Sequence, residues 1–264
     1  MIEIKDIDDI RISLYKSLRF TPCSHIENNV FIAEGKKVTL KLLNSNIKIQ
    51  SLFIISEFFY EYKSLIISKE ITEDNIFIAE KNLMEQIVGF KLHSGVMAIG
   101  MQPDFTPIEQ LGNKIVILNA VRDAENVGSI ARNATAFKVN SLIFDEQSSS
   151  PYLRRAVRVS VGNVFDLKIN KAQNLEKTIL NLKSLGYQIL CAEICKNSIE
   201  INKINFAEKV AIIFGNEGDG IEEKYLNLCD SICFIPISEK VDSLNVAASS
   251  AIFLYNLSKR FADL

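Results

Sequence analysis

Short apolar runs alternate with amphipathic segments along the whole chain, and this alternation is typical of α/β proteins. In the first hundred residues we expect a compact α/β unit. The apolar runs predict strands at 30–33, 49–56, 74–80 and 95–101. Helical spacing predicts helices at 8–18, 36–46, 57–68 and 81–90.

The second half repeats this alternation with longer apolar strands, which are typical of a parallel sheet with helices on both faces. We expect strands or extended segments at 114–121, 141–145, 164–169, 187–193, 209–215 and 231–237. Helices are expected at 126–138, 150–163, 174–186, 221–229 and 246–260. Between the halves, residues 103–113 hold two prolines and a glycine and are the best linker candidate. The predicted domains are therefore 1–102 and 114–264.

Composition narrows the class of protein. The 264 residues are 48% hydrophobic and 23% charged, which is ordinary for a globular protein with a substantial core. No apolar run is long enough to predict a membrane span, and the N-terminus lacks the apolar stretch of a secretory signal. We therefore expect a cytoplasmic protein. The net charge of −2 does not by itself indicate nucleic acid, although a local basic patch could still bind RNA.

Cysteines and histidines offer little chemistry. In a reducing cytoplasm the five cysteines are interpreted as thiols. The C-x3-C pairs 191/195 and 229/233 overlap with zinc-site spacing, but both lie in or beside apolar strand-like runs. Burial is therefore the favoured interpretation, and we expect no metal. His25 and His93 are far apart in sequence and show neither triad nor ligand spacing.

Three predicted strands of the second half end in loops rich in small and polar residues, where ligands bind to open parallel sheets. The first loop contains Asn126, Gly128 and Arg132. Arg132 lies one helical turn after Gly128, where its cation can reach a phosphate or sugar oxygen, although it could also be a solvated surface residue. Asn126 could simply be a helix N-cap. The third loop contains Ser243 and Asn245, either of which could also cap a helix.

The second loop, Gly215-Asn216-Glu217-Gly218-Asp219-Gly220, directly follows an apolar strand. Its glycines allow positive φ and the close approach of a flat ligand, although a tight turn would also explain them. The order G-x-x-G-x-G differs from the G-x-G-x-x-G of dinucleotide folds, and no acidic residue follows at the required distance. A nucleotide-cofactor oxidoreductase is therefore disfavoured.

Together the loops resemble, in wording and order, the three motifs of the SpoU (TrmH) family of SPOUT RNA ribose methyltransferases. The first match spans Arg122 to Ala136, the second Ile213 to Ile221, and the third Ile235 to Val246. The segment Arg154 to Ile169 is similar to a family segment ending S-x-G-A, with Asn163 in place of the usual small residue. The stretches 31–38 and 95–100 resemble the family's substrate-binding domain of the ribosomal protein L30e type.

The resemblance implies a fold, a cofactor and partners. We expect a C-terminal SPOUT domain with a deep trefoil knot, S-adenosylmethionine as methyl donor, and a homodimer with the active site across its interface. The expected reaction is methylation of a ribose 2′-hydroxyl in a structured tRNA or rRNA. A non-catalytic RNA-binding relative is the alternative. It would lack Arg132 or the glycine loop, and this chain has both.

Site residues follow from the same resemblance. The expected catalytic residues are Asn126, Arg132, Glu217, Ser243 and Asn245. The family's arginine has been proposed as a general base. We instead expect Arg132 to hold a phosphate and stabilise the nascent oxyanion, because guanidinium stays protonated in proteins. The expected cofactor contacts are Gly215, Asn216, Gly220, Ile235, Pro236 and Leu244. Candidate RNA contacts are Lys36, Lys37, Lys41, Arg154, Arg155 and Arg158.

Overall fold

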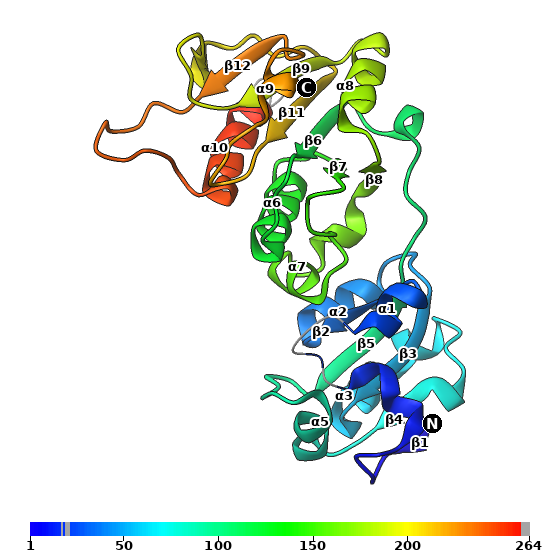
Figure 1. The fold of residues 1–264 in the computed structure, drawn as a ribbon. Coiled ribbons are helices and arrows are strands. Elements are labelled where there is room, and N and C mark those ends of the chain that lie inside the picture. The colour runs from blue at the N-terminus through cyan, green and yellow to red at the C-terminus, as the bar shows by residue number, and fades with distance from the viewer. Residues whose placement is uncertain (17, 19–21, 260–264) are drawn as a thin grey trace. The chain divides into compact units, whose positions relative to one another are not determined.

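The computed structural model describes residues 1–16, 18 and 22–259, which form two compact units (Figure 1). Unit 1 comprises Met1–Pro103 and Tyr152–Phe165. Unit 2 comprises Asp104–Pro151 and Asp166–Leu264. The segment 152–165 packs with the N-terminal unit, although it was expected in the C-terminal domain, and residues 104–113 of the expected linker belong to unit 2.

Unit 1 is built on a mixed five-stranded sheet with the order β1-β4-β3-β5-β2. The strands are β1 (Ile2–Glu3), β2 (Val30–Glu34), β3 (Ile49–Ile54), β4 (Ile76–Ile78) and β5 (Val96–Met101). β5 runs antiparallel to both β2 and β3, whereas β4 runs parallel to β1 and β3. All four predicted strands of this half are therefore present, and β1 is an addition that the short apolar stretch at the N-terminus did not reveal.

The helices of unit 1 are shorter than the sequence pattern predicts. They are α1 (Cys23–Glu27), α2 (Lys36–Leu43), α3 (Ser56–Glu61), α4 (Lys63–Ile67), α5 (Lys81–Val88) and α7 (Arg154–Val159), with 3₁₀ helices at Ile10–Tyr15 and Glu73–Asn75. The helix predicted at 57–68 is split at Tyr62, whose φ of −116° is not helical. The helix predicted at 8–18 is a 3₁₀ helix as far as the described residues extend.

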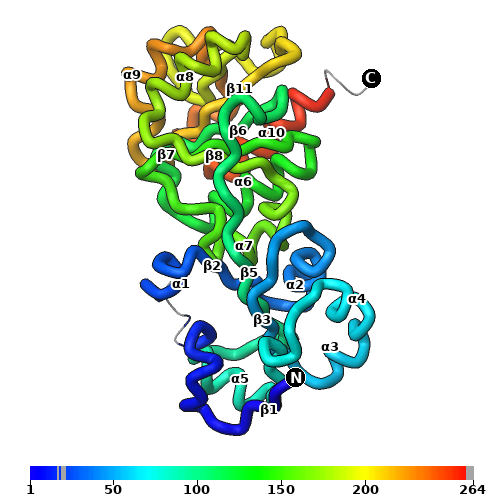
Figure 2. Tube along the Cα trace, turned by 90° about the vertical axis from the view of Figure 1, so that its right-hand side faces the viewer, coloured from blue at the N-terminus to red at the C-terminus, as the bar shows by residue number. Residues whose placement is uncertain are grey.

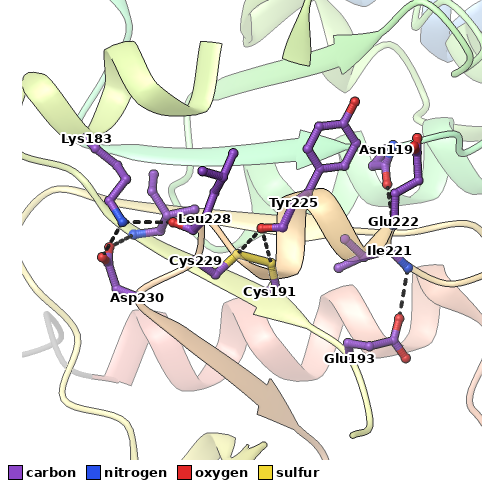
Figure 3. The surroundings of a disulfide bond; sticks show 11 residues. Asn119, Lys183, Cys191, Glu193, Ile221, Glu222, Tyr225, Leu228, Cys229 and Asp230 are labelled. Atoms are coloured by element: carbon purple, nitrogen blue, oxygen red, sulfur yellow. Dashed lines mark hydrogen bonds and ion pairs between the residues drawn. A yellow bond between two sulfur atoms is a disulfide. The ribbon is translucent and has the colours of Figure 1, made fainter. Parts of the chain in front are cut away.

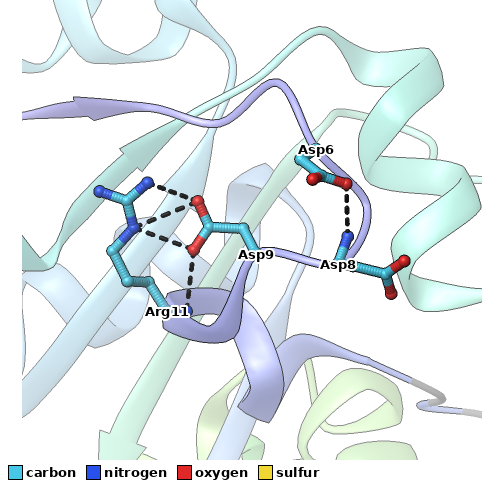
Figure 4. A network of polar contacts seen from close by, with 4 residues as sticks. All are labelled: Asp6, Asp8, Asp9 and Arg11. Atoms are coloured by element: carbon cyan, nitrogen blue, oxygen red, sulfur yellow. Dashed lines mark hydrogen bonds and ion pairs between the residues drawn. The ribbon is translucent and has the colours of Figure 1, made fainter.

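Asp9 starts that 3₁₀ helix by a local polar contact (Figure 4). Its carboxylate accepts the backbone N–H of Arg11 and the Nε–H of the same residue, each at 2.9 Å. These hydrogen bonds from Arg11 lower the pKa of Asp9 to about 2. The contact is exposed, so it sets where the helix begins and contributes little to stability.

The segment 152–165 is held on unit 1 by aromatic and ionic contacts. The ring of Phe31 in β2 lies 5.4 Å from that of Tyr152 and 5.3 Å from that of Phe165. Arg154 forms an ion pair with the buried carboxylate of Glu34 and lies 4.6 Å from the centre of the Phe90 ring. Burial of Tyr152 raises the pKa of its phenol. These contacts explain why α7 associates with a unit distant in sequence.

Unit 2 contains a seven-stranded sheet in the order β10-β12-β9-β11-β6-β7-β8. The strands are β6 (Lys114–Leu118), β7 (Ser141–Asp145), β8 (Lys168–Ala172), β9 (Gln188–Ala192), β10 (Ile199–Glu200), β11 (Val210–Phe214) and β12 (Ser231–Phe234). Every pair in this sheet is parallel, as the apolar runs predict. The two-residue β10 was not predicted.

Helices cover both faces of this sheet, as expected. They are α6 (Ala124–Ala136), α8 (Leu175–Ser184), α9 (Glu223–Leu226) and α10 (Val246–Lys259), with 3₁₀ helices at Ile108–Gln110 and Ile201–Lys203. A further 3₁₀ helix, Asn163–Asp166, spans the sequence boundary at which the chain passes from unit 1 to unit 2. Ile179 of α8 and Tyr225 of α9 pack with Ile213 on one face. The next residue, Phe214, points to the opposite face, where its ring lies 5.6 Å from Phe253 of α10. α10 also packs along α6 (Figures 1 and 2).

The expected linker lies largely on unit 2. Thr106 donates its backbone N–H to the carbonyl of Ile169 in β8 at 2.7 Å. The side-chain amide of Asn170, also in β8, donates to the Thr106 carbonyl at 2.8 Å. Leu111 joins the core beneath α8. The expected linker is therefore an ordered part of unit 2, and only Pro103 of it belongs to unit 1.

The interpretation of all five cysteines as thiols is wrong, because Cys191 and Cys229 form a disulfide (Figure 3). Cys191 lies on β9, on the face that α9 covers, and Cys229 follows the C-terminal end of α9, so their Cα atoms are 6.3 Å apart. The bond joins the first cysteine of each C-x3-C pair. Cys23, Cys195 and Cys233 remain thiols. Within the described residues, no three His, Cys, Asp or Glu side chains gather as a metal site.

No helix within the described part of the chain is long and apolar enough to cross a bilayer. His25 is buried, with Nε2 2.7 Å from the Leu14 carbonyl oxygen, which fits a structural role.

Candidate active site

A cavity of about 600 Å³ opens at the carboxyl ends of β9, β11 and β12 in unit 2. Its walls come mainly from four segments, 192–195, 214–221, 233–237 and 242–253, and Leu226 of α9 adds to them. The first three directly follow the three strands, and the last leads into α10. The volume lies in the range of small-molecule and cofactor sites, and the position is the one expected for a ligand of a parallel sheet.

The glycine loop closes on itself along one wall of this cavity. Asn216 and Gly220 pair across the loop, with N–O distances of 3.2 Å and 3.0 Å. The Asn216 side chain accepts the backbone N–H of Gly218 at 2.8 Å and donates to the Ala120 carbonyl at 2.9 Å. Asn216 therefore shapes the loop and ties it to the end of β6.

Two of the glycines are required by the geometry. Gly220 has a φ of +68°, and a Cβ there would lie 2.4 Å from a carboxylate oxygen of Glu193. A Cβ on Gly215 would lie 2.6 Å from the backbone of Gly220. The glycines of this loop thus allow positive φ and close backbone approach, as the sequence indicates, although the close approach seen is between parts of the chain itself.

The three loops meet through one asparagine amide. Asn126 donates its Nδ2–H to the carboxylate of Glu217. Its Oδ1 accepts a hydrogen bond from Asn245 Nδ2 at 3.0 Å. Residues from the first, second and third loops are therefore connected although Asn126 and Asn245 are 119 positions apart. Because Glu217 also lines the cavity, this chain of hydrogen bonds begins at the cavity wall.

Capping explains part of this arrangement. Asn126 is not the N-cap of α6, since Asp123 takes that position and accepts the N–H of Glu125 at 2.8 Å. Asn245, in contrast, caps α10 by accepting the N–H groups of Ala247 and Ala248 at 2.9 Å and 3.3 Å. Its cap and its bond to Asn126 use different atoms of the same amide, so the start of α10 is fixed to α6.

Most of the predicted site residues lie at the cavity, whereas Arg132 is not among its lining residues. Seven line the cavity, namely Gly215, Asn216, Glu217, Gly220, Ile235, Ser243 and Leu244. Asn126 and Asn245 join this set through their hydrogen bonds. Pro236 lies within the third wall but is not a lining residue. Arg132 lies exposed on α6 and makes no ion pair within residues 1–16, 18 and 22–259, which leaves its cation available to a ligand.

Sequence reasoning missed Glu193, the first residue after β9, which also lines the cavity. Its carboxylate accepts the N–H of Ile221 at 3.0 Å, so it holds the exit of the glycine loop (Figure 3). The available signal was an acidic residue at the carboxyl end of a predicted parallel strand, which the neighbouring cysteine pair obscured. Cys195 and Cys233 line the cavity as well, and burial raises the pKa of the Cys233 thiol to about 12.

Charge along the cavity wall is acidic. Glu193, Glu217, Asp219 and Asp242 contribute carboxylates, and no lysine, arginine or histidine is among the lining residues of the described chain. Such a wall suits a ligand that carries positive charge, because opposite charges attract more strongly in a partly enclosed site.

The candidate RNA contacts all belong to unit 1 and differ in availability. Arg154 is engaged by Glu34, and Lys36 forms an ion pair with Glu61 at 2.8 Å, which raises the pKa of Lys36. Lys41 donates to the side chain of Asn163. Lys37, Arg155 and Arg158 have exposed side chains, and Arg155 is itself engaged by another residue.

Comparison with known proteins decides the family. The family model described as the SpoU rRNA Methylase family matches residues 113–255, more than half of the chain. The chain belongs to this family. The match begins one residue before β6 and ends within α10, so it covers nearly all the strands and loops that build the cavity.

Relatives extend the SpoU likeness over both units. An uncharacterized tRNA/rRNA methyltransferase of Mycobacterium bovis is 28% identical, with 97% of this chain and 91% of the relative covered. The 23S rRNA (guanosine(2553)-2'-O)-methyltransferase RlmP of Bacillus subtilis is 23% identical, with 97% and 99% covered. The crystal structure of an AdoMet-bound rRNA methyltransferase from Sinorhizobium meliloti has a TM-score of 0.85, with 23% identity and 98% of each chain covered. The α/β fold of this chain is thus that of a known rRNA methyltransferase structure.

Proposed function

We propose that this SpoU family member transfers a methyl group from S-adenosylmethionine to a ribose 2′-hydroxyl of a tRNA or rRNA. The observation that carries the proposal is the meeting of the three loops, joined through Asn126, at the wall of a cavity of about 600 Å³. The relatives whose names state a reaction are RNA methyltransferases, and RlmP, similar over 97% of this chain, is named as a 2'-O-methyltransferase.

The cavity fits the proposed cofactor in size and charge. Its acidic wall suits the sulfonium and ammonium groups of S-adenosylmethionine, and the glycine loop offers backbone groups to an adenine and a ribose. Gly215, Asn216, Gly220, Ile235 and Leu244 are the residues proposed to hold it, and Pro236, which does not line the cavity, would bend the chain next to Ile235. When bound, this cofactor supplies a methyl group already activated for displacement.

The protein's own contribution is positioning and electrostatics. Displacement needs the hydroxyl in line with the methyl group, and positioning supplies most of the acceleration in such reactions. We propose that Arg132 holds the phosphate next to the reacting ribose and stabilises negative charge developing on its 2′-oxygen. Ser243, Glu217, Asn126 and Asn245 orient the sugar and the arginine. Since no histidine lines the cavity within the described chain, histidine-based proton transfer has no support.

RNA binding is proposed for unit 1, in line with an L30e-like substrate domain. Lys37 and Arg158 have exposed side chains and would contact phosphates, and Arg155, also exposed, would join them by exchanging its present contact. Lys36, Lys41 and Arg154 could join only by giving up the contacts they make within the unit. The net charge of −2 favours recognition of a structured RNA by shape. Such substrates are consistent with a cytoplasmic enzyme.

We also propose the family's homodimer and trefoil knot for this chain. α10 supports the dimer, because Ala248 and Tyr255 leave apolar surface exposed on a helix otherwise packed on α6. The knot is supported by the position of the C-terminal end. Residues of the 235–245 segment and of α10 line the same cavity as the glycine loop, as a knotted C-terminal end would require. Sedimentation equilibrium would measure the dimer directly, and a monomer at working concentration would refute it.

Mapping of 2′-O-methyl marks in total RNA from a deletion strain tests the function. One mark should be lost, and wild-type protein should restore it whereas Arg132→Ala should not. Full restoration by Arg132→Ala would remove this residue from the mechanism. The non-catalytic alternative predicts no lost mark. A thermal-shift comparison of S-adenosylmethionine with NAD tests the cofactor, and stabilisation by NAD alone would favour an oxidoreductase.

A further inference from the structure

Asp145 is a buried carboxylate with no cationic partner in the described chain. It is the last residue of β7 and is only 5% exposed. A buried charge without a counter-ion requires several hydrogen bonds. Its donors are the Asn119 side chain at 2.9 Å, the Ala120 N–H at 3.1 Å, and the Ser148 N–H and hydroxyl at 2.8 Å and 2.7 Å. All of them lie in the loops that follow β6 and β7.

These bonds fix an unusual backbone conformation after β6. Ala120 has a φ of +53°, a left-handed conformation that residues with a Cβ adopt at a cost. The carboxylate holds this residue by its N–H. The Ala120 carbonyl then points to Asn216, whose Nδ2–H it accepts at 2.9 Å. The entry of the glycine loop is therefore tied to Asp145 through Ala120.

A second connection reaches the exit of the same loop. Asn119 donates its amide N–H to Asp145, and its Oδ1 accepts the backbone N–H of Glu222 at 3.4 Å (Figure 3). Asn216 near the start of the glycine loop and Glu222 just after its end are thus bonded to Ala120 and Asn119, two adjacent residues that both bind the Asp145 carboxylate. Asp145 itself is not a cavity-lining residue, so any effect it has on the cavity passes through these two residues.

We propose that Asp145 is a positioning residue that sets the shape of the glycine loop and so the affinity of the cavity for S-adenosylmethionine. This inference rests on the proposed cofactor. Asp145→Asn keeps the volume but replaces one acceptor oxygen by an NH₂ group that faces N–H donors. Because the Ala120 N–H lies 3.1 Å from both carboxylate oxygens, either placement of the NH₂ removes one of its two acceptors and weakens the hold on the left-handed residue. If the NH₂ faces Asn119, the Asn119 amide must turn over and lose its bond to Glu222.

The experiment measures S-adenosylmethionine binding by calorimetry and melting temperature for four proteins. We expect Asp145→Asn to bind about 10-fold more weakly, the effect of one lost hydrogen bond to a charged group. Ala120→Gly adopts positive φ without strain, so the double variant Asp145→Asn/Ala120→Gly should recover most of the affinity. Lys138→Gly is the control for the backbone effect, since Lys138 is another non-glycine loop residue of unit 2 with positive φ, 59°, but is exposed and makes no contact with the site. Combined with Asp145→Asn, it should raise the melting temperature without recovering affinity.

The outcomes separate the two proposals. If wild-type protein does not bind S-adenosylmethionine, the proposed cofactor is wrong. If wild type binds it and Asp145→Asn binds equally well, or if Lys138→Gly rescues as well as Ala120→Gly, the positioning role is wrong. Should Asp145→Asn not fold, Asn119→Ala tests the same connection, because it leaves Asp145 bound to Ala120 and Ser148. It should weaken binding severalfold and speed amide exchange at Glu222, and unchanged affinity would overturn the proposal.

Discussion

Asn245 donates a hydrogen bond from its side chain to Asn126, at 3.0 Å, and at the same time caps the N-terminal end of α10. Asn126 in turn donates a hydrogen bond to Glu217 at the cavity wall. The start of α10, the start of α6 and the glycine loop therefore hold fixed positions relative to one another. This fixed geometry is what an in-line transfer reaction requires.

Asn126→Asp should disrupt this contact by placing a carboxylate against Glu217. We expect kcat for RNA methylation to fall about 100-fold, whereas KM for S-adenosylmethionine changes by less than about threefold. Steady-state kinetics with a methyl-labelled cofactor measures both. Asn202→Asp makes the same chemical change at an exposed position of unit 2 and should leave both constants unchanged. An equal loss in the control, or none in Asn126→Asp, would contradict the role assigned to this contact.

Much of the fold was predictable from periodicity. The apolar runs at 114–121 and 209–215 contain β6 and β11, which pair in register at the centre of the parallel sheet. Long buried strands give the clearest signal because both faces select apolar residues. The short elements were not predictable, since the two-residue strands β1 and β10 are too brief for any period to be detected.

The residues of the three loops were predictable from the sequence, whereas the residues that hold these loops in place were not. Asn126, Glu217 and Asn245 stand in recognisable motifs, and the structure joins them. Glu193 and Asp145 were missed because each is a single acidic residue at a strand end, and its role depends on which backbone groups the fold brings near it. The Cys191–Cys229 bond was missed for a related reason, because spacing within each pair says nothing about contacts between pairs.

Arg154 and Arg158 should differ although both are arginines of α7. Arg154→Ala leaves the buried Glu34 carboxylate without its partner, so we expect a loss of about 2–4 kcal/mol in the stability of unit 1. Arg158 is exposed, and Arg158→Ala should change stability by less than about 0.5 kcal/mol while weakening RNA binding. Urea unfolding and filter binding measure the two effects. A stable Arg154→Ala variant with weak RNA binding would instead assign that residue to the RNA.

The double variant Arg154→Met/Glu34→Gln separates the lost ion pair from lost packing. It removes both charges and keeps an apolar side chain over the Phe90 ring, which Arg154 now contacts at 4.6 Å. We expect it to recover at least half of the stability lost in Arg154→Ala, because the main cost is the unpaired buried charge.

Reduction of the Cys191–Cys229 disulfide should destabilise unit 2. The bond closes a loop with a sequence separation of 38. Chain-entropy arguments give about 4 kcal/mol for a loop of that length. Cys229→Ser should therefore lower the free energy of unfolding by about this amount, and dithiothreitol should affect wild type but not the variant. Cys23→Ser, which removes an exposed thiol of unit 1, is the control and should behave as wild type. A wild type indifferent to dithiothreitol would refute the stabilising role.

His25 should make unit 1 less stable as the pH falls below neutrality. Its ring is 4% exposed, and burial lowers its pKa below the ordinary 6.5, against the opposing hydrogen bond to the Leu14 carbonyl. As the pH falls, His25 is therefore protonated near pH 6.5 in the unfolded chain, whereas it is still neutral at that pH in the folded chain. Stability is highest above that value and declines between it and the lower folded pKa, with a slope of at most about 1.4 kcal/mol per pH unit.

Urea midpoints measured from pH 7.5 to pH 5 for wild type and His25→Gln test this expectation. Glutamine can still donate to Leu14 but does not ionise, so the decline with acidification should be smaller in this variant by the histidine's share. His93→Gln makes the same exchange at an exposed position of unit 1 and serves as the control for the substitution itself. If His25→Gln and wild type decline in parallel, the folded pKa of His25 is not lowered, and the acid sensitivity of unit 1 must come from its carboxylates.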